Sequence, residues 1–287
     1  MIETHIHLSK NNYDQIFPYI AMDSKDYIIK VEGTREKLIE EMKEEGVECC
    51  IEPAIDVDSN ELILNLCKRY LGFIYPAIGN HPTRCVKSTF SDFKRVKDYS
   101  KDKRVIAIGE TGLDYHYDRK EQHRMKQKIW FQYQINLADK LELPLILHIR
   151  NADEDGIKIL RRNRNKLHGG VCHCFGSGPD IAEVYIEELG LCIGVGGTLL
   201  MRDEISLPLQ ESVKAVSINS ILLETDGPYV RPHKPQNEEI SKKKWQKARN
   251  TSLILPAVIR RIAELKDMSF EEVEKITSDN ARRVFGI

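Results

Sequence analysis

Short apolar runs recur along the chain, and a longer helix-like stretch follows most of them. Several of the runs are continuously apolar rather than alternating, which is typical of parallel strands that are covered on both faces. The pattern predicts eight strands, within residues 2–7, 47–53, 72–79, 104–110, 144–150, 169–175, 191–197 and 220–226.

Helix start and stop signals lie between the runs. Thr34 precedes an amphipathic segment that ends at Gly46, which predicts a helix over residues 35–46. Asp58 and Glu61 have the spacing of a capping box. Further helices are predicted over 121–141, over 180–188 and after a second box formed by Ser269 and Glu272.

Eight strands that alternate with helices in a chain of 287 residues predict a TIM-like (β/α)8 barrel. A barrel of this size commonly forms one domain, so a single domain over residues 1–287 is expected. An open doubly wound sheet is the competing fold, because the pattern does not show whether the sheet closes.

The bulk composition narrows the class of protein and of partner. Hydrophobic residues make up 41% of the chain and charged residues 30%, as in ordinary globular proteins. The net charge of −1 offers no global basic field, so binding of a polyanion requires a local patch. Seven cysteines, an odd number found mostly in apolar runs, indicate reduced thiols rather than a disulfide framework. A signal-peptide pattern and a membrane-length apolar stretch are both missing, so a cytoplasmic protein without a membrane partner is expected.

Two histidines stand one residue apart near the start of the chain. In Ile2–Leu8 the apolar side chains alternate with polar ones, and on a strand His5 and His7 share a face. Two imidazoles on one face can hold a metal ion, although a merely polar strand face explains the pair equally well.

The ends of the other runs favour the metal. Active-site residues of a (β/α)8 barrel follow the carboxyl ends of its strands. Five of the nine histidines occupy such positions, together with carboxylates from separate runs. The set comprises His5, His7, His81, Glu110, His148, His173, Glu224 and Asp226. Packing does not explain this concentration, and the sequence predicts a metal centre.

The mixture of ligands indicates the kind of metal. Imidazole nitrogens and carboxylate oxygens, without a thiolate cage, suit zinc, manganese, iron or cobalt, and magnesium less obviously. One tetrahedral ion with an open position uses fewer ligands than the chain offers. We therefore expect two divalent ions, with a bridging carboxylate and a water nucleophile whose proton passes to a further carboxylate.

The motifs HIHL, GNHP, GETGLDY, LHIR, HCFGSG and ETDGPY occur in the order found in the TatD family, and the chain resembles that family over nearly its whole length. The resemblance implies a metal-dependent hydrolase, commonly a deoxyribonuclease that trims DNA ends with divalent ions such as Zn, Mn or Mg. It implies a first ion held by His5, His7, Glu110 and Asp226, and a second held by Glu110, His148 and His173. Glu110 is thereby a bridging ligand, Asp226 orients or deprotonates the attacking water, and His81 contacts the scissile phosphate.

Two positions depart from the pattern of the family. Glu3 stands where the family often has aspartate, and Gly227 follows Asp226 where serine is common. Loss of the serine hydroxyl removes a possible hydrogen bond next to Asp226. Neither departure removes an implied ligand.

Several neighbours of these motifs are candidates for substrate binding. Arg150 shares a strand face with His148 and could contact an anionic substrate, or form a structural ion pair. Tyr229 and Arg231 follow Asp226 and could stack on a base and hold a phosphate. The basic stretch 242–247, which includes Trp245, could line a groove for a nucleic-acid backbone.

Three functions are compatible with the sequence. The leading hypothesis is a two-metal phosphodiesterase that acts on the ends of DNA. The second is an amidohydrolase-like enzyme that hydrolyses a small ester, lactone or amide. The third is a non-catalytic scaffold that keeps a metal for stability, which the complete ligand set disfavours.

Overall fold

The protein is described by a computed structural model that covers residues 1–9, 13, 15–23, 26–117, 120–234 and 240–287. Contacts between Cα atoms divide the chain into two compact units, and each is described by itself. Unit 1 comprises Met1–Cys50, Cys174–Pro179 and Gly194–Asn280, and unit 2 comprises Ile51–His173, Asp180–Ile193 and Ala281–Ile287. A single domain over residues 1–287 stays a prediction.

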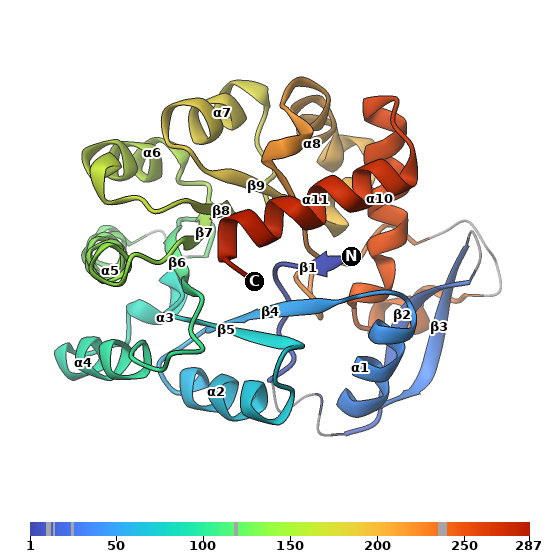
Figure 1. Cartoon of the computed structure of the whole chain (residues 1–287), viewed down its shortest axis with the longest axis horizontal. Helices are drawn as coiled ribbons and strands as arrows, with labels where there is room; N and C mark the ends of the chain where they lie inside the picture. Colours follow the sequence, from blue (N-terminus) through green and yellow to red (C-terminus); the bar gives the residue numbers. More distant parts are fainter. Residues whose placement is uncertain (10–12, 14, 24–25, 118–119, 235–239) are drawn as a thin grey trace. The chain divides into compact units, whose positions relative to one another are not determined.

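Each of the eight predicted runs overlaps one strand of an eight-stranded sheet, in the order β1-β4-β5-β6-β7-β8-β9-β10 (Figure 1). The pairings between β1 and β4, and from β5 through β9, are parallel. The strands are β1 (Ile2–Glu3), β4 (Cys49–Pro53), β5 (Ile74–Ile78), β6 (Ala107–Asp114), β7 (Leu145–Arg150), β8 (Gly170–Cys172), β9 (Cys192–Val195) and β10 (Ile221–Leu223).

Hydrogen bonds within unit 1 join the first and last strands of this order. The Thr4 N–H, directly after β1, donates to the carbonyl of Leu223 in β10 at 2.9 Å. The Thr4 hydroxyl donates to the same oxygen at 2.8 Å. The sheet therefore closes, so the predicted (β/α)8 barrel class is confirmed and the open sheet is wrong.

The first strand is shorter than predicted, because a side chain takes over its hydrogen bonding. Glu3 Oε1 accepts the backbone N–H groups of His5 at 3.1 Å and of Thr225 at 2.9 Å. These two N–H groups are thus removed from the regular ladder, and β1 ends at Glu3. The chain beyond it still runs beside residues after β10, since the His7 N–H donates to the carbonyl of Gly227 at 2.8 Å.

Helices follow most of the strands, and the predicted helix over 121–141 is confirmed at both ends as α5. Thr34 caps α1 as expected, and the box of Ser269 and Glu272 is present. The box at Asp58 is wrong, because Asp56 accepts the Ser59 N–H instead. The helices are α1 (Arg35–Glu44), α2 (Ser59–Arg69), α3 (Pro82–Cys85), α4 (Phe90–Tyr99), α5 (Glu121–Leu141), α6 (Asp153–Arg162), α7 (Pro179–Glu183), α8 (Asp203–Ala215), α9 (Lys242–Lys247), α10 (Leu255–Lys266) and α11 (Phe270–Phe285).

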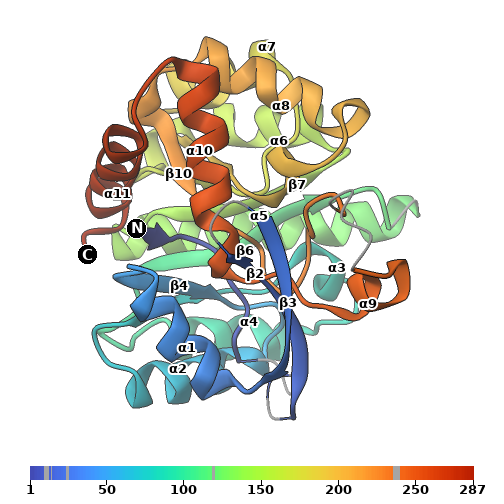
Figure 2. The ribbon, with the colours of Figure 1, turned by 90° about the vertical axis from the view of Figure 1, so that its right-hand side faces the viewer.

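A β-hairpin that the strand–helix rhythm did not predict belongs to unit 1. It consists of antiparallel strands β2 (Phe17–Asp23) and β3 (Asp26–Gly33) (Figure 2). Tyr19 Oη donates to Glu41 of α1 at 2.8 Å, and the Tyr19 ring is fully buried. The hairpin therefore packs against α1 with one face, as half-buried antiparallel strands do.

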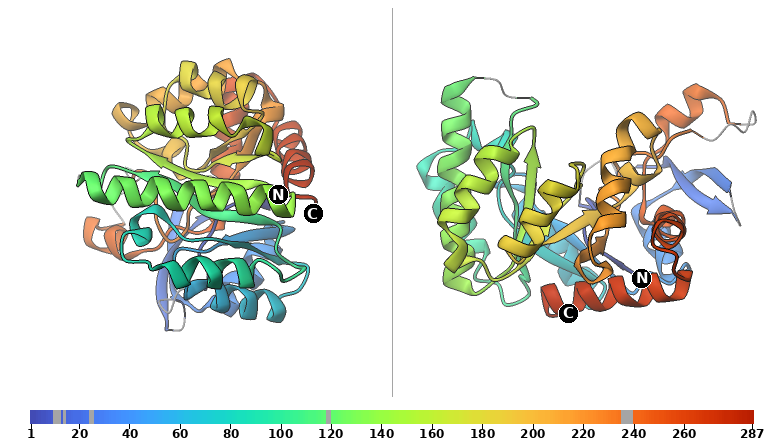
Figure 3. Two further views of the ribbon diagram at one scale, coloured as in Figure 1. Left: turned by 90° about the vertical axis from the view of Figure 1, so that its left-hand side faces the viewer. Right: turned by 90° about the horizontal axis from the view of Figure 1, so that it is seen from above.

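In unit 2 the long helix α5, green in Figure 3, covers β6 and holds the loop that follows β5. Phe131 and Ile135 of α5 are completely buried. Gln134 Oε1 accepts the Asn80 N–H at 2.8 Å, and its Nε2 donates to the Thr111 hydroxyl at 2.7 Å. The buried amide of Gln134 thus ties the loop before His81 to β6.

Candidate metal centre

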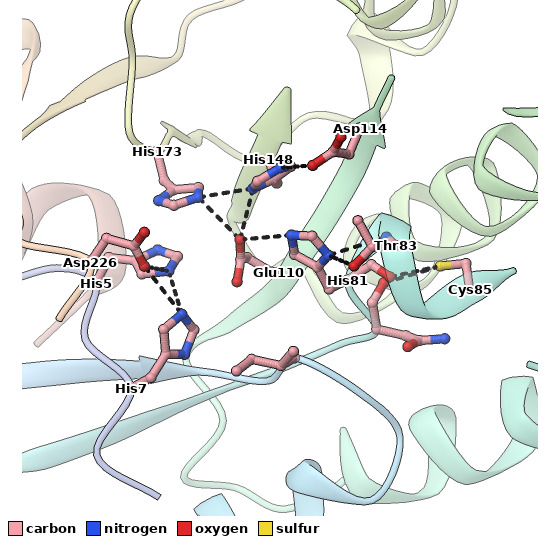
Figure 4. A network of polar contacts seen from close by, with 12 residues as sticks. His5, His7, His81, Thr83, Cys85, Glu110, Asp114, His148, His173 and Asp226 are labelled. Atoms are coloured by element: carbon pink, nitrogen blue, oxygen red, sulfur yellow. Dashed lines mark hydrogen bonds and ion pairs between the residues drawn. The ribbon is translucent and has the colours of Figure 1, made fainter. Parts of the chain in front are cut away.

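Unit 1 gathers three potential ligands, His5, His7 and Asp226, which we call the His5 cluster (Figure 4). The two Nε2 atoms lie 3.2 Å apart. Asp226 Oδ1 lies 3.3 Å from His7 Nε2 and 3.7 Å from His5 Nε2. Both histidines are buried, whereas the side chain of Asp226 is 15% exposed. The prediction that the two histidines share a face is confirmed.

The spacing of the His5 cluster fits a metal ion. Ligand atoms about 2.1 Å from a tetrahedral zinc ion lie about 3.4 Å from one another. The three donor atoms of the cluster are 3.2, 3.3 and 3.7 Å apart. Two imidazoles and one carboxylate can therefore bind one divalent ion with little movement.

Glu3, the buried last residue of β1, supports the His5 cluster through its carboxyl group. In addition to the backbone N–H groups of His5 and Thr225, it accepts the hydroxyls of Thr225 at 2.7 Å and of Ser252 at 2.9 Å. Burial raises the pKa of Glu3 to about 8 despite these hydrogen bonds. Glu3 thus fixes the backbone on both sides of the cluster, a role that its place two residues before His5 could have suggested.

Unit 2 gathers a second set, Glu110, His148 and His173, which we call the Glu110 cluster. Glu110 Oε1 lies 3.0 Å from His148 Nδ1 and 3.0 Å from His173 Nε2. The two ring nitrogens are 3.2 Å apart. These distances again match the separation of ligands around one small divalent ion.

The orientation of His148 is set by Asp114. Asp114 Oδ2 lies 3.1 Å from His148 Nε2, so this nitrogen holds the proton and Nδ1 keeps its lone pair toward the cluster. Burial alone would lower the pKa of His148, but Asp114 and Glu110 outweigh burial and raise it. Asp114 also accepts the N–H groups of His116 and Tyr117, at 2.9 and 3.1 Å, so it orders the loop as well.

We expect Asp114→Asn to weaken binding of metal to the Glu110 cluster by about 10–100-fold. The asparagine oxygen can still accept the two loop N–H groups, but its NH2 group turns a donor toward His148 Nε2. The imidazole must then protonate Nδ1 and lose its inward lone pair. Competition with a chromophoric chelator measures the affinity. Asp98→Asn, which alters an exposed carboxylate of α4 paired with Lys101, is the control, and equal affinities in both variants would contradict the role of Asp114.

His81 points its ring at the Glu110 cluster but differs from the ligands. Its Nε2 lies 3.4 Å from Glu110 Oε1, and together with Glu110 and His148 it forms a group whose ligand atoms lie within 4.8 Å of one another. Burial, aided by the neighbouring His148, lowers the pKa of His81 to about 3. Its Nδ1 accepts the backbone N–H of Thr83 at 3.1 Å. The neutral ring therefore holds its proton on Nε2, which makes His81 a hydrogen-bond donor rather than a metal ligand.

Glu224 has a supporting role in unit 1. One of its oxygens accepts the backbone N–H of Cys174, the residue directly after His173. Cys174 adopts a left-handed conformation with φ of 48°. Glu224 also packs directly against Gly194, where the Cβ of any larger residue would lie 2.2 Å from Glu224 Oε2. Glu224 thus holds the turn that follows β8.

The predicted substrate residues have different surroundings. Tyr229 is 46% exposed, and its ring centroid lies 6.0 Å from that of His7. Arg150 is exposed, with its guanidinium carbon 5.0 Å from the centroid of the Tyr117 ring. Arg231 donates to the backbone carbonyls of Gln246 and Ala248. Their contact with substrate stays a prediction.

No helix among the described residues is long and apolar enough to span a membrane.

Comparison with known proteins shows which family the chain resembles. The family model described as TatD related DNase matches residues 2–286. An uncharacterized metal-dependent hydrolase of Bacillus subtilis, YabD, is 32% identical over 100% of this chain and 99% of its own. A protein of Yersinia pseudotuberculosis named 3'-5' ssDNA/RNA exonuclease TatD is 29% identical, over 87% of this chain and 92% of its own.

A solved structure shows the same fold. The crystal structure of the TatD homologue YJJV from Escherichia coli superposes with a TM-score of 0.82 at 24% identity, and the match covers 100% of this chain and 98% of that one. The match of the family model along the chain, the 32% identity to YabD and the shared fold lead to one conclusion. The chain belongs to the TatD family of metal-dependent hydrolases.

Proposed function

We propose that the protein is a divalent-metal-dependent nuclease that hydrolyses phosphodiester bonds at the ends of single-stranded DNA. The observation that supports it most is the pair of donor triads, each with three nitrogen or oxygen atoms 3.0–3.7 Å apart. The nuclease named in Yersinia pseudotuberculosis supplies the substrate class. The metals we propose are Zn, Mn or Mg ions, one in each cluster.

The ligands divide between the two clusters. His5, His7 and Asp226 hold one ion, and Glu110, His148 and His173 hold the other. A bridging role of Glu110 stays a prediction, because it concerns both units. Divalent ions in such sites lower the pKa of a bound water and neutralise charge on a phosphoryl group.

Three side chains of the protein would move the proton of the attacking water and orient the substrate and a ligand. Asp226 is the partly exposed member of its cluster, and its carboxylate accepts the proton of the attacking water. His81 directs its Nε2–H toward a phosphate oxygen, because the Thr83 N–H occupies its other nitrogen. Asp114 keeps the lone pair of His148 turned toward the ligands.

The proposal predicts a metal-dependent ladder of products from end-labelled single-stranded DNA. The purified protein is assayed with Mg, Mn or Zn, with a chelator, and with strands labelled at either end. Cleavage should stop in chelator and proceed from one end only. A parallel panel holds bis(p-nitrophenyl) phosphate, a lactone, a carboxylic ester and an amide. If the protein hydrolyses a small ester, lactone or amide and leaves DNA uncleaved, the nuclease proposal is rejected in favour of the amidohydrolase-like alternative.

A further inference from the structure

A pocket of about 800 Å³ lies in unit 1, beside the loop that follows Asp226. Its lining combines basic side chains with an apolar floor that includes Ile205 and the largely buried Trp245 of α9. None of the described residues that line it is acidic. Its volume falls within the range of pockets that bind organic ligands, and exceeds the space for one inorganic ion.

Three positive side chains of the pocket, Arg202, Arg231 and Lys242, form no ion pair with a carboxylate of the described residues. Arg202 donates to His233 Nε2 at 3.3 Å, a neutral acceptor. Arg231 donates to two backbone carbonyls, which hold its guanidinium in place without cancelling its charge. Lys242 is exposed at the start of α9 and lines the same hollow. Such a concentration of like charge is unfavourable by itself and favours an anion.

The pocket is connected to the His5 cluster through one short loop of unit 1. The Tyr229 N–H donates to the carbonyl of Asp226 at 2.8 Å, and the Tyr229 ring contacts His7. Arg231 stands two residues further on and lines the pocket. A nucleic-acid strand bound near Asp226 therefore has a cationic and apolar surface available along the same loop.

We propose that this pocket binds the phosphates of a nucleic-acid strand beyond the linkage that is cleaved, with sugar or base against its apolar floor. The inference rests on the proposed nuclease function and deepens it. Arg202 and Lys242 supply phosphate contacts, and Arg231 supplies a third charge of fixed position. The pocket thereby selects strands of several nucleotides over dinucleotides, which have no phosphate beyond the reacting one.

The double variant Arg202→Gln/Lys242→Gln tests the pocket. Each lost phosphate contact on a single strand lowers the slope of log Kd against log salt by about 0.7, so two lower it by about 1.4. If wild type and variant bind equally at 1 M salt, this difference in slope predicts that at 0.1 M salt the variant binds a twelve-nucleotide strand about 25-fold more weakly than the wild type. Fluorescence anisotropy with the metal-loaded protein and a cleavage-resistant phosphorothioate strand measures both quantities.

The control is Lys37→Gln/Lys43→Gln, which removes two exposed charges from α1 of the same unit and none from the pocket. It should bind the strand as the wild type does, and all three proteins should hydrolyse bis(p-nitrophenyl) phosphate at equal rates. Equal affinity and equal salt slope in wild type and pocket variant overturn the proposal. If the wild type binds the phosphorothioate strand through the pocket but leaves natural DNA intact, the nuclease function fails while the pocket stands.

Discussion

Replacing Glu110 by glutamine is expected to lower hydrolysis by about 10³-fold and to remove the ion of the Glu110 cluster. The carboxylate oxygen lies 3.0 Å from ring nitrogens of both His148 and His173, so it is the only anion among the three donors of that cluster. Loss of its charge removes several kcal/mol of metal-based stabilisation, and each 1.36 kcal/mol changes the rate tenfold.

Elemental analysis of the purified variant and the rate on bis(p-nitrophenyl) phosphate measure the two effects of Glu110→Gln. Thermal unfolding in chelator should match that of the wild type in chelator, which separates loss of metal from loss of fold. Glu188→Gln removes an exposed carboxylate paired with Arg161 and serves as control. Full activity with unchanged metal content in Glu110→Gln would rule out the proposed role.

Replacing Asp226 by asparagine is expected to lower the rate by about 10³-fold, within the range for loss of a general base, while most of the metal stays bound. An amide oxygen can still be a ligand, but it accepts a proton far less readily than a carboxylate. Asparagine is also one of the few residues that tolerates the left-handed backbone of Asp226, whose φ is 53°.

Asp226→Ala is the matched comparison, because alanine removes the ligand as well as the base. We expect this variant to lose metal from the His5 cluster and to lose stability, since alanine does not readily adopt a positive φ. Metal content, rate and unfolding temperature are measured for both variants. A rate in Asp226→Asn close to that of the wild type would exclude Asp226 as the base.

The strands and the ligand candidates could be predicted because their signals are local. Continuous apolar runs such as that of β7 mark buried parallel strands, and the barrel architecture places His148 and His173 at strand ends. The hairpin of β2 and β3 was missed because it lies outside the alternation of strand and helix.

The supporting residues depend on contacts that sequence spacing does not reveal. Asp114 belongs to the motif GETGLDY, but its spacing does not reveal that it orders the loop after β6 and fixes the proton of His148 from another strand. The sequence shows Glu3 only as a glutamate at a position where the family often has aspartate. In the structure its carboxyl group accepts hydrogen bonds from Thr225 and Ser252, more than 200 residues away in the chain. Such long-range hydrogen bonds are decided by the packed fold.

The discontinuity of unit 1 has a consequence for how the protein is made. His5 and His7 leave the ribosome long before the partners of their segment, such as Leu223, which follows 219 residues after Thr4. All members of the Glu110 cluster have been synthesised by residue 173, about 50 residues before Asp226, which corresponds to roughly 3–10 s of translation. We therefore expect a nascent chain to acquire its ion at His148 and His173 first, and His5 and His7 to receive a metal only after Asp226 has been synthesised.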